Sequence, residues 1–480
     1  MKIKVLFLFF LSAFSYAQNI PFPINRLTAN YVVENNKNSS SLLVLRTKES
    51  SLAVRLDSEN KILDSLRIEN SNRDYENLFA KTYDGNIAQL YWVDDTKKEF
   101  LRQTIDFNSK ESDFATIFKT SFKNQINIVE FSNNDIYYYV TLDKKTNIIH
   151  FHEFKNDGTY TDRQVDFSNE KFLSSDYKQL KFLDVVTQYK GVDGTSNFTF
   201  EYIIPEQVTA ITFAASKRKA YLQNNTLVFT LDTNLNATDL IYFNLDDLSY
   251  TRKSINQPIL TYTYRMKSNS FLFEDHLYQF KLNDDSFILT VKDNENNLKT
   301  SLGTMNDEDI SYAIGKVKSQ GVNKTEYKEF ESTNKFMRKF RNMKGGLTVY
   351  NYKDAKLLTI GAVGLEDNAG KGIMIGGAAG GLVGGLVGAL IMQATHSATM
   401  NNYDTYTKRN VMYFNTAFNN KFELVNIDID ELPLDKINTF IKSQGKDISH
   451  INLLFKNDAY YLGYASKKDN KYNWKVFPKW

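Results

Sequence analysis

The chain has 480 residues, and its 42% hydrophobic and 24% charged residues are ordinary for a globular protein with a substantial core. Its 59 basic and 56 acidic side chains give a formal net charge of +3, so it lacks the concentrated positive charge of a nucleic-acid-binding protein, and we expect no nucleic-acid partner. The absence of cysteine excludes disulfides, thiolate metal sites and cysteine nucleophiles.

Residues 1–17 have the features of a secretory signal peptide. Two lysines precede an apolar stretch, and Ser15 and Ala17 place small side chains at the −3 and −1 positions of a cleavage site before Gln18. The apolar stretch is shorter than the roughly 20 residues that span a bilayer, and a retained membrane anchor is the alternative. The leader resembles those of exported proteins of Gram-negative bacteria, which implies a location in the cell envelope, in the periplasm or the outer membrane.

From about residue 30 to residue 306, apolar and polar residues alternate with a period of two, which indicates β-strands joined by polar turns. Helical periodicity is nearly absent from this region. We therefore predict one antiparallel β unit with little helix. The clearest predicted strand pairs are 135–142 with 147–154, 226–231 with 239–245, and 277–282 with 286–291.

Three segments with the same order of aromatic, polar or basic, and aliphatic residues suggest degenerate repeats. They are residues 100–107, 160–167 and 250–255, and the interval between the last two matches two units of about 45 residues. The pattern resembles β-propellers of bacterial exported proteins, which implies about five to seven blades of four strands. A different antiparallel sandwich or barrel is the competing architecture. We predict that residues 18–320 form the propeller-like domain.

After about residue 320 the pattern becomes α+β. Residues 323–343 carry aromatic and methionine residues at roughly helical spacing, and the glycines at 345 and 346 are expected to end that helix. We divide the remainder into 321–371, a helix plus strands, and 396–480, a smaller α+β C-terminal region. The other predicted elements are strands at 347–350, 356–360, 411–418 and 422–427, a helix at 432–444, and a hairpin of 451–455 with 459–464.

Residues 372–395 form an uncharged segment of 24 residues that holds eight of the chain's 22 glycines. In a helix these glycines would cover one side, and leucine and valine the other. In water so much glycine disfavours a helix, whereas a bilayer enforces one and lets a second helix approach the glycine side closely. The two glycine rows are Gly372, Gly376, Gly380, Gly384 and Gly388, and Gly377, Gly381 and Gly385.

This segment resembles the glycine-zipper segments of bacterial envelope proteins and of membrane-inserting peptides. The resemblance implies that the eight glycines form a membrane or oligomer interface. A single helix would be about 36 Å long, against a hydrocarbon core of about 30 Å, whereas each leg of a hairpin would reach only about 18 Å. If the flanking strands belong to one sheet, the segment must leave and return on the same side. A flexible loop or a buried helical hairpin within a soluble domain is the alternative.

Few residues suggest chemistry. His150 and His152 lie on one face of a predicted strand near Glu153, and two such imidazoles can begin a metal site, but spacing supplies no third ligand. Polar positions on an outward face are the simpler interpretation. Residues 232–239 have the spacing of a calcium loop without its glycine, so we expect an ordinary hairpin loop. We assign no catalytic residue, cofactor or metal ligand.

Together these features favour an exported envelope protein with a non-catalytic binding or scaffold role. It would be membrane-associated or oligomerised through residues 372–395, and its β-rich domain would bind a protein or glycan partner. The alternatives are a propeller-type enzyme acting on glycan or peptide, and a conditional membrane inserter.

Overall fold

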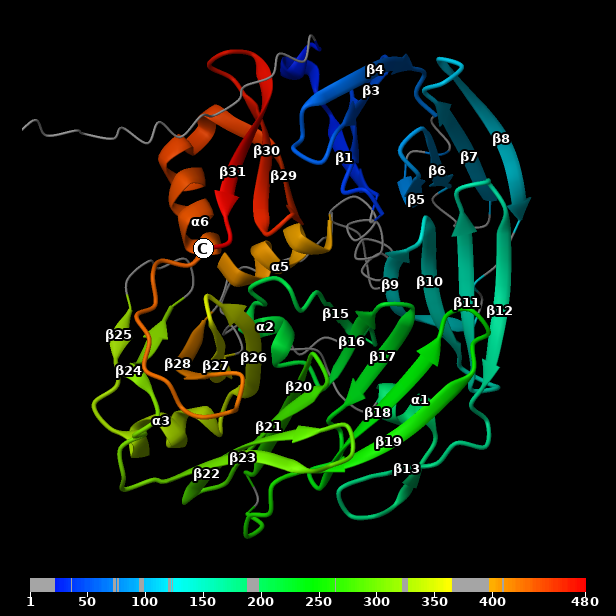
Figure 1. Ribbon diagram of the computed structural model, residues 1–480. Helices are drawn as coiled ribbons and strands as arrows, with labels where there is room; N and C mark the ends of the chain where they lie inside the picture. Colours follow the sequence, from blue (N-terminus) through cyan, green and yellow to red (C-terminus); the bar gives the residue numbers. More distant parts are fainter. Residues whose placement is uncertain are drawn as a thin grey trace, which may run out of the picture.

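The computed structural model describes residues 22–35, 37–71, 75, 77–94, 99–119, 122, 124–187, 198–263, 265–321, 327–364, 397–407 and 410–480, without the side chains of 116–119. The predicted signal peptide, residues 1–17, and the glycine-rich segment, residues 372–395, lie outside the described residues and stay predictions. The described part of the chain is mainly β, and its sheets form a ring (Figure 1).

Seven sheets of three to five strands follow one another around this ring as the blades of a β-propeller, and the first three each pair four consecutive strands in order (Figure 1). Blade 1 contains β1 (Ala29–Glu34), β2 (Ser41–Arg46), β3 (Ser51–Leu56) and β4 (Ile62–Ile68). Blade 2 contains β5 (Asn77–Tyr83), β6 (Ile87–Val93), β7 (Glu99–Asp106) and β8 (Glu111–Lys119). Blade 3 contains β9 (Gln125–Asn133), β10 (Ile136–Asp143), β11 (Ile148–Lys155) and β12 (Tyr160–Asp166).

Blades 4 and 5 continue the pattern, with one extra strand in blade 4. Blade 4 contains β16 (Arg218–Gln223), β17 (Thr226–Leu231), β18 (Ala237–Asn244) and β19 (Tyr250–Asn256), and β15 (Glu201–Ile203) joins β16 in parallel. Blade 5 contains β20 (Lys267–Phe273), β21 (His276–Leu282), β22 (Ser286–Asp293) and β23 (Leu298–Met305). The chain between β12 and β16 also forms β13 (Phe172–Leu173), β14 (Gln179–Leu180), α1 (Phe182–Thr187) and α2 (Ile211–Ala214).

Blade 6 is assembled out of chain order, as β25-β24-β28-β27-β26, and blade 7 completes the ring. Blade 6 contains β24 (Ile314–Gln320), β25 (Lys328–Glu329), β26 (Lys344–Tyr352), β27 (Ala355–Val363) and β28 (Val411–Phe418). Blade 7 contains β29 (Ile448–Lys456), β30 (Ala459–Ser466) and β31 (Lys471–Pro478). The associated helices are α3 (Thr333–Phe340), α5 (Ala398–Thr407) and α6 (Pro433–Gln444), with short 3-10 turns at Ile24–Arg26 and Gly445–Asp447.

The hydrophobic core lies between neighbouring blades, because alternate residues of each strand face the next sheet. Phe79 of blade 2 meets Tyr139 of blade 3 with ring centroids 4.9 Å apart. Phe151 of blade 3 likewise meets Phe243 of blade 4 at 5.5 Å. Burying such a side chain contributes about 1.5–3 kcal/mol, so these contacts join the blades into one body.

Blade 7 closes the ring against blade 1. Residues of both blades form one buried cluster, and the Asn30 side-chain amide donates to the His450 carbonyl at 2.8 Å. Lys456 Nζ donates to the Ser39 carbonyl at 2.8 Å. The first and last blades are therefore held together by side chains rather than by a shared strand of the described chain.

Most predicted strands are confirmed. The predicted strands at 226–231 and 411–418 coincide with β17 and β28, and the predicted helix at 432–444 corresponds to α6. Apart from the short β13–β14 pair and the parallel β15, the described strands from β1 to β23 form five antiparallel blades, and α1 and α2 are short. The boundary drawn at residue 320 falls inside blade 6, because β24 pairs with β28.

The helix predicted over 323–343 is wrong in extent, because the described helix α3 spans only Thr333–Phe340. Its start is set by Ser332, whose side chain accepts a hydrogen bond from the Lys335 N–H. Glycines 345 and 346 lie within β26 rather than ending a helix. A Cβ at Gly346 would lie 2.8 Å from the Ala215 nitrogen, so this glycine lets β26 approach the end of α2.

Two further predictions from the sequence are wrong. Residues 422–427 form no strand; the chain leaves the sheet there, with Phe422 at a positive φ of 62° and a single bridge between Phe418 and Leu424. The supposed repeat interval from 160 to 250 also holds one blade rather than two. Strands β12 and β19 are the outermost strands of neighbouring blades, and β13, β14 and α1 occupy the additional length.

Candidate functional sites

The connection that contains residues 372–395 begins and ends in one sheet. Val363 of β27 pairs with Val411 of β28, and the Gly364 N–H donates to the Asn410 carbonyl at 2.9 Å. The flanking strands are therefore neighbours in blade 6. As argued from the sequence, a segment between two strands of one sheet must leave and return on the same side. No helix of the described residues is both long and apolar enough to cross a bilayer.

Helix α5 returns the chain from this connection through the centre of the ring (Figure 1). The Ser397 hydroxyl just before α5 donates to the Leu453 carbonyl of blade 7. The Asn402 amide donates to the Val208 carbonyl and accepts from the Ala210 N–H, both at 2.7 Å. Because both groups of this buried amide are used on backbone, α5 joins blade 7 to the chain that leads into α2.

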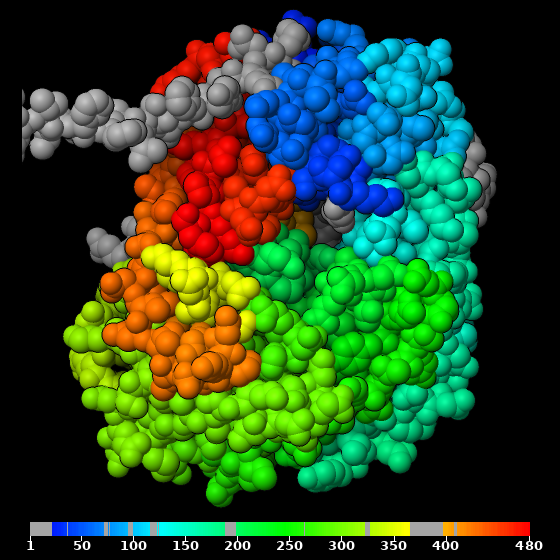
Figure 2. All heavy atoms as spheres, in the orientation of Figure 1, coloured from blue at the N-terminus to red at the C-terminus, as the bar shows by residue number. Residues whose placement is uncertain are grey.

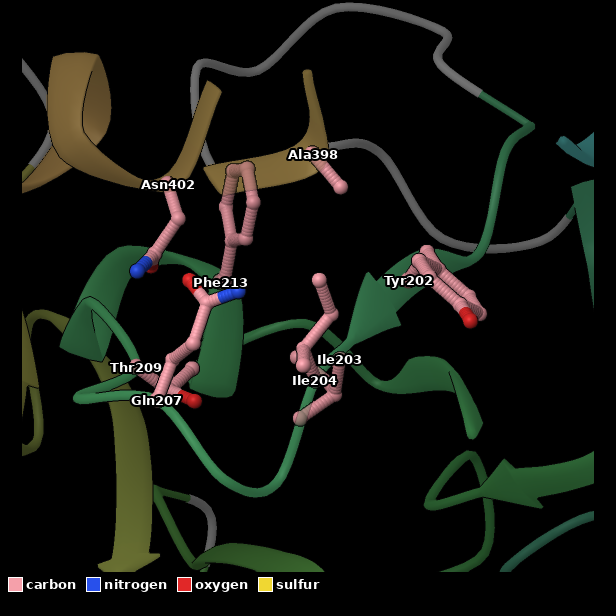
Figure 3. A pocket seen from close by; sticks show the side chains of 8 residues that line it. All are labelled: Tyr202, Ile203, Ile204, Gln207, Thr209, Phe213, Ala398 and Asn402. Carbon is pink, nitrogen blue, oxygen red and sulfur yellow. The ribbon is translucent and has the colours of Figure 1, made fainter. Parts of the chain in front are cut away.

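A pocket lies between α5, α2 and the chain that follows β15 (Figure 3). It leaves about 10 Å³ for the centre of a water-sized molecule, which is room for about one water. Figure 2 shows the ring centre in this view as a narrow hollow between blades 1, 7 and 4. We interpret the pocket as a packing gap beside α5. Its lining residues are Tyr202, Ile203, Ile204, Gln207, Thr209, Phe213, Ala398 and Asn402.

A second small pocket, where blades 1, 2 and 3 meet, contains charged groups. Burial raises the pKa of Glu34 to about 7, against the opposing effect of Lys456 and Lys81. Burial also lowers the pKa of Lys81 to about 8. This pocket likewise leaves about 10 Å³ for the centre of a water-sized molecule. A pocket of this size has no room for a ligand larger than a water molecule. We therefore expect these charged groups to affect stability rather than to bind a ligand.

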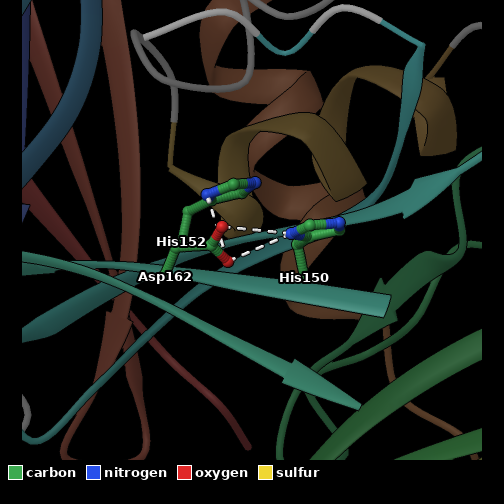
Figure 4. A group of neighbouring side chains, drawn as sticks. All are labelled: His150, His152 and Asp162. Carbon is green, nitrogen blue, oxygen red and sulfur yellow. Dashed lines mark hydrogen bonds and ion pairs between the residues drawn. The ribbon is translucent and has the colours of Figure 1, made fainter. Parts of the chain in front are cut away.

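The two histidines singled out from the sequence lie with an aspartate in blade 3 (Figure 4). His152 of β11 pairs directly with Asp162 of β12, and His150 lies two residues away on the same face. His150 Nδ1 lies 3.1 Å from Asp162 Oδ2, and His152 Nδ1 lies 3.9 Å from Asp162 Oδ1. The imidazole rings are stacked, with an interplanar angle of 7°. Two imidazoles and a carboxylate therefore converge, which is a donor set for transition metals or for proton transfer.

His152 is held by a hydrogen-bond network. Its Nε2 lies 2.9 Å from Gln125 Oε1, and its Nδ1 lies 2.8 Å from the Tyr160 hydroxyl. Only 2% of the residue is exposed, and burial lowers its pKa to about 4, so the imidazole is neutral at physiological pH. The amide oxygen can only accept, so we assign the ring proton to Nε2 and the lone pair to Nδ1.

The sequence was wrong about the exposure of His152, because this face of β11 is covered by blade 2 and by Phe122, whose ring centroid lies 4.8 Å away. Glu153 points to the opposite face, where it forms an ion pair with Arg163. Asp162 was missed because it lies ten positions from His152 and meets it only through the register of the hairpin. Extending the predicted strand pairing into 160–167 would have found it.

Residues 232–236 connect β17 to β18, which confirms the predicted hairpin loop, and Asp232 within this loop is wholly buried. It forms an ion pair with Lys219 at 3.1 Å, and neither side chain is exposed. Thr238 donates to one carboxylate oxygen at 2.7 Å, and the Ser270 hydroxyl donates to the other at 2.9 Å. The Lys219 charge is the main influence that holds the pKa of Asp232 below its ordinary value despite burial. The carboxylate thus serves blades 4 and 5 as a structural anion.

Comparisons with known proteins identify no family for this chain. No protein-family model matches it, and no curated protein matches it. Among solved structures, it is similar to a prolyl endopeptidase with 10% identity and a TM-score of 0.33, covering 95% of this chain but 51% of that chain. Our chain therefore spans about half the length of that enzyme.

Two further solved structures are similar at the same low level. An oligogalacturonate lyase in complex with manganese has 10% identity and a TM-score of 0.31, covering 94% of this chain and 89% of that chain. The WD40 domain of SCAP from fission yeast has 10% identity and a TM-score of 0.28, covering 94% and 84%. We take the propeller from the strand order of the chain itself and draw no activity from these similarities.

Proposed function

We propose that this protein is an exported cell-envelope protein whose propeller is a non-catalytic binding scaffold, held at a membrane or in an oligomer by residues 372–395. The observation that supports this proposal most directly is the attachment of both ends of that connection to the ring. One end continues from Gly364, which is hydrogen-bonded to Asn410, and the other is α5, which shares a buried cluster with residues of blade 6 and bonds to blade 7 and to the chain between β15 and α2.

A hydrophobic segment attached in this way enters and leaves from one body. One complete crossing would place its ends about 30 Å apart on opposite sides of a bilayer, whereas both ends lead into blade 6. A shallow helical hairpin, with legs of about 18 Å, agrees better with these attachments. The glycine rows would then let the two legs, or two copies of the protein, pack closely.

Membrane fractionation of the exported chain tests the main proposal. The variant replaces residues 372–395 with a Gly-Ser linker of the same length, so that β27 and α5 stay connected. We expect the parent protein in the membrane fraction or in crosslinked oligomers, and the linker variant as a released monomer. Equal fractionation and equal crosslinking of the two proteins would contradict the proposal.

The glycine interface has its own matched test. The pair Gly380→Ile and Gly384→Ile places side chains on the proposed contact, whereas Leu382→Ile and Leu386→Ile changes the opposite side with little change in volume. Each lost glycine contact weakens packing by about 1 kcal/mol, so the first pair should lower the crosslinked fraction roughly tenfold and the second should not. Identical behaviour of the two pairs would indicate a pliable loop.

Export and partner binding complete the proposal. Mass spectrometry of exported protein should find a mature N-terminus at Gln18, and a retained leader would contradict it. The β-rich ring would bind a protein or a glycan.

The main alternative, an enzyme acting on glycan or peptide, is favoured by the convergence of His150, His152 and Asp162. Turnover of such substrates that is lost in Asp162→Asn would support it. Leakage of liposomes caused by the purified protein would instead support a conditional membrane inserter.

A further inference from the structure

Three Lewis-basic atoms of blade 3 lie within 4.8 Å of one another: a ring nitrogen of His150, a ring nitrogen of His152 and a carboxylate oxygen of Asp162 (Figure 4). They come from two adjacent strands whose pairing fixes their relative position. We propose that these residues form a binding site for a divalent transition-metal ion of the zinc class. The site is independent of residues 372–395 and of the proposed scaffold role.

The spacing suits a small ion. Zinc binds nitrogen and oxygen at about 2.0–2.2 Å, which places tetrahedral ligands about 3.4 Å apart. The separations from Asp162 to His150 and to His152, 3.1 and 3.9 Å, lie on either side of that value. The three donor atoms span up to 4.8 Å, so the two imidazole nitrogens must move towards each other, by up to about 1.4 Å, to complete a tetrahedral site. Two nitrogens and one oxygen favour zinc and related ions over calcium or magnesium, which prefer oxygen ligands.

The surroundings of His152 prepare it for this role. Gln125 Oε1 accepts the proton of Nε2, so Nδ1 carries the lone pair; this atom lies 2.8 Å from the Tyr160 hydroxyl and 3.9 Å from Asp162 Oδ1. In metal sites the ligating imidazole commonly donates its other N–H to an acceptor that fixes its tautomer and orientation, and Gln125 provides that acceptor.

The Tyr160 hydroxyl is the donor that satisfies Nδ1 when no cation is bound. Metal binding requires this hydroxyl to turn away from Nδ1. The site also has an approach from solvent, because the side chain of Asp162 is 30% exposed, whereas those of His150 and His152 are 12% and 2% exposed. Three protein ligands leave a fourth tetrahedral position on the open side for water or a ligand.

Zinc titration of the full-length exported chain, after removal of bound metal with EDTA, tests the site. We expect one ion per chain with a dissociation constant of about 1 μM or lower, and at least tenfold weaker binding by His150→Gln and by Asp162→Asn. Cobalt(II) serves as a spectroscopic probe, and we expect the intense visible absorption of a four-coordinate ion in the parent protein alone. Asp162→Asn changes a partly exposed side chain without changing its shape, so circular dichroism should confirm that this variant is folded.

The matched controls are His276→Gln and His450→Gln, each of which removes one imidazole from another blade. Both should bind zinc like the parent protein. Tyr160→Phe should bind zinc as tightly or more tightly, because it removes the hydroxyl that competes for Nδ1. Failure of the parent protein to take up one zinc ion, or equal affinity in the parent and Asp162→Asn, would overturn the proposal.

Discussion

The carboxylates of Asp232 and Asp162 both contact residues of neighbouring strands, but their surroundings differ. Asp232 is wholly buried, neutralised by Lys219 and hydrogen-bonded by hydroxyl groups on both oxygens. Asp162 is partly exposed and faces two imidazoles, one of which is neutral. The first arrangement is electrostatically complete, whereas the second leaves donor atoms directed at a common point. A carboxylate between strands thus indicates a ligand site only when its neighbours are themselves potential ligands rather than counter-charges.

The strongest test of this comparison is removal of the Asp232 carboxylate. Asp232→Ala leaves the Lys219 ammonium buried without its counter-ion, so we expect a loss of about 3–5 kcal/mol in the free energy of unfolding, measured in urea. Asp246→Ala, in an exposed turn, should change it by less than about 0.5 kcal/mol. A small effect of Asp232→Ala would show that the pair is not a structural necessity.

The double replacement of Asp232 and Lys219 sharpens this result. Apolar residues of similar size at both positions should recover much of the loss, because neither leaves an unpaired charge. The coupling between the two single changes then measures the ion pair itself. Additive losses would contradict the interpretation of the pair as one unit.

A neutral example of a complete network is Asn402 of α5. Asn402→Ala leaves the Val208 carbonyl and the Ala210 N–H without their partner, so we expect a loss of about 2 kcal/mol in urea unfolding. Asn401→Ala, its partly exposed neighbour on the same helix, is the control and should cost less than about 0.5 kcal/mol. Similar losses for both would mean that α5 contributes only through its general packing.

The Glu34 carboxyl is only partly neutralised by its neighbours, and the pH dependence of the free energy of unfolding tests its state. Its folded pKa, about 7, lies above its ordinary value of 4.5, so folding favours the protonated form. The associated stability is fully present below pH 4.5 and is lost as the pH rises through about 7. Relative to Glu34→Gln, the parent protein should lose about 3 kcal/mol between pH 4.5 and pH 7.5, measured by urea unfolding. Parallel pH profiles of the two proteins would show that Glu34 is better solvated than its surroundings suggest.

The smallest effect is expected at Asp162 in metal-free protein. Its side chain is 30% exposed, so Asp162→Asn should change the free energy of unfolding by less than about 1 kcal/mol. The loss in the free energy of unfolding caused by Asp232→Ala should then be at least three times the loss caused by Asp162→Asn. A loss as large as that of Asp232→Ala would place Asp162 among the structural anions.

The sequence predicted strands better than their assembly. Alternating residues and polar turns located hairpins such as β10 with β11, because period and turn chemistry are local properties. The ring could not be predicted in full, because contacts such as Phe151 with Phe243 join residues from separate blades. Helix α5 was missed because its polar sequence becomes a helix through side chains such as Asn402, which bond to another part of the chain.

The candidate sites show the same division between local and distant information. His150 and His152 are recognisable from their spacing, but Asp162 requires the register of β11 with β12. Asp232 lies in the predicted hairpin loop, but its ion pair could not be predicted, because its partner Lys219 lies on another strand, β16. The predicted glycine interface lies outside the described residues and stays a prediction.

The seam between blades 1 and 7 has a consequence for how the protein folds. Asn30 and His450 are 420 positions apart, whereas hairpin strands meet across short turns. Closing a flexible loop of that length costs about 5 kcal/mol of chain entropy, so this contact gains little until the intervening blades are ordered. Joining the first blade to the last should therefore be a late and slow event, and before it the nascent chain is an open arc with two apolar blade faces exposed. Those faces are where a chaperone would be needed most.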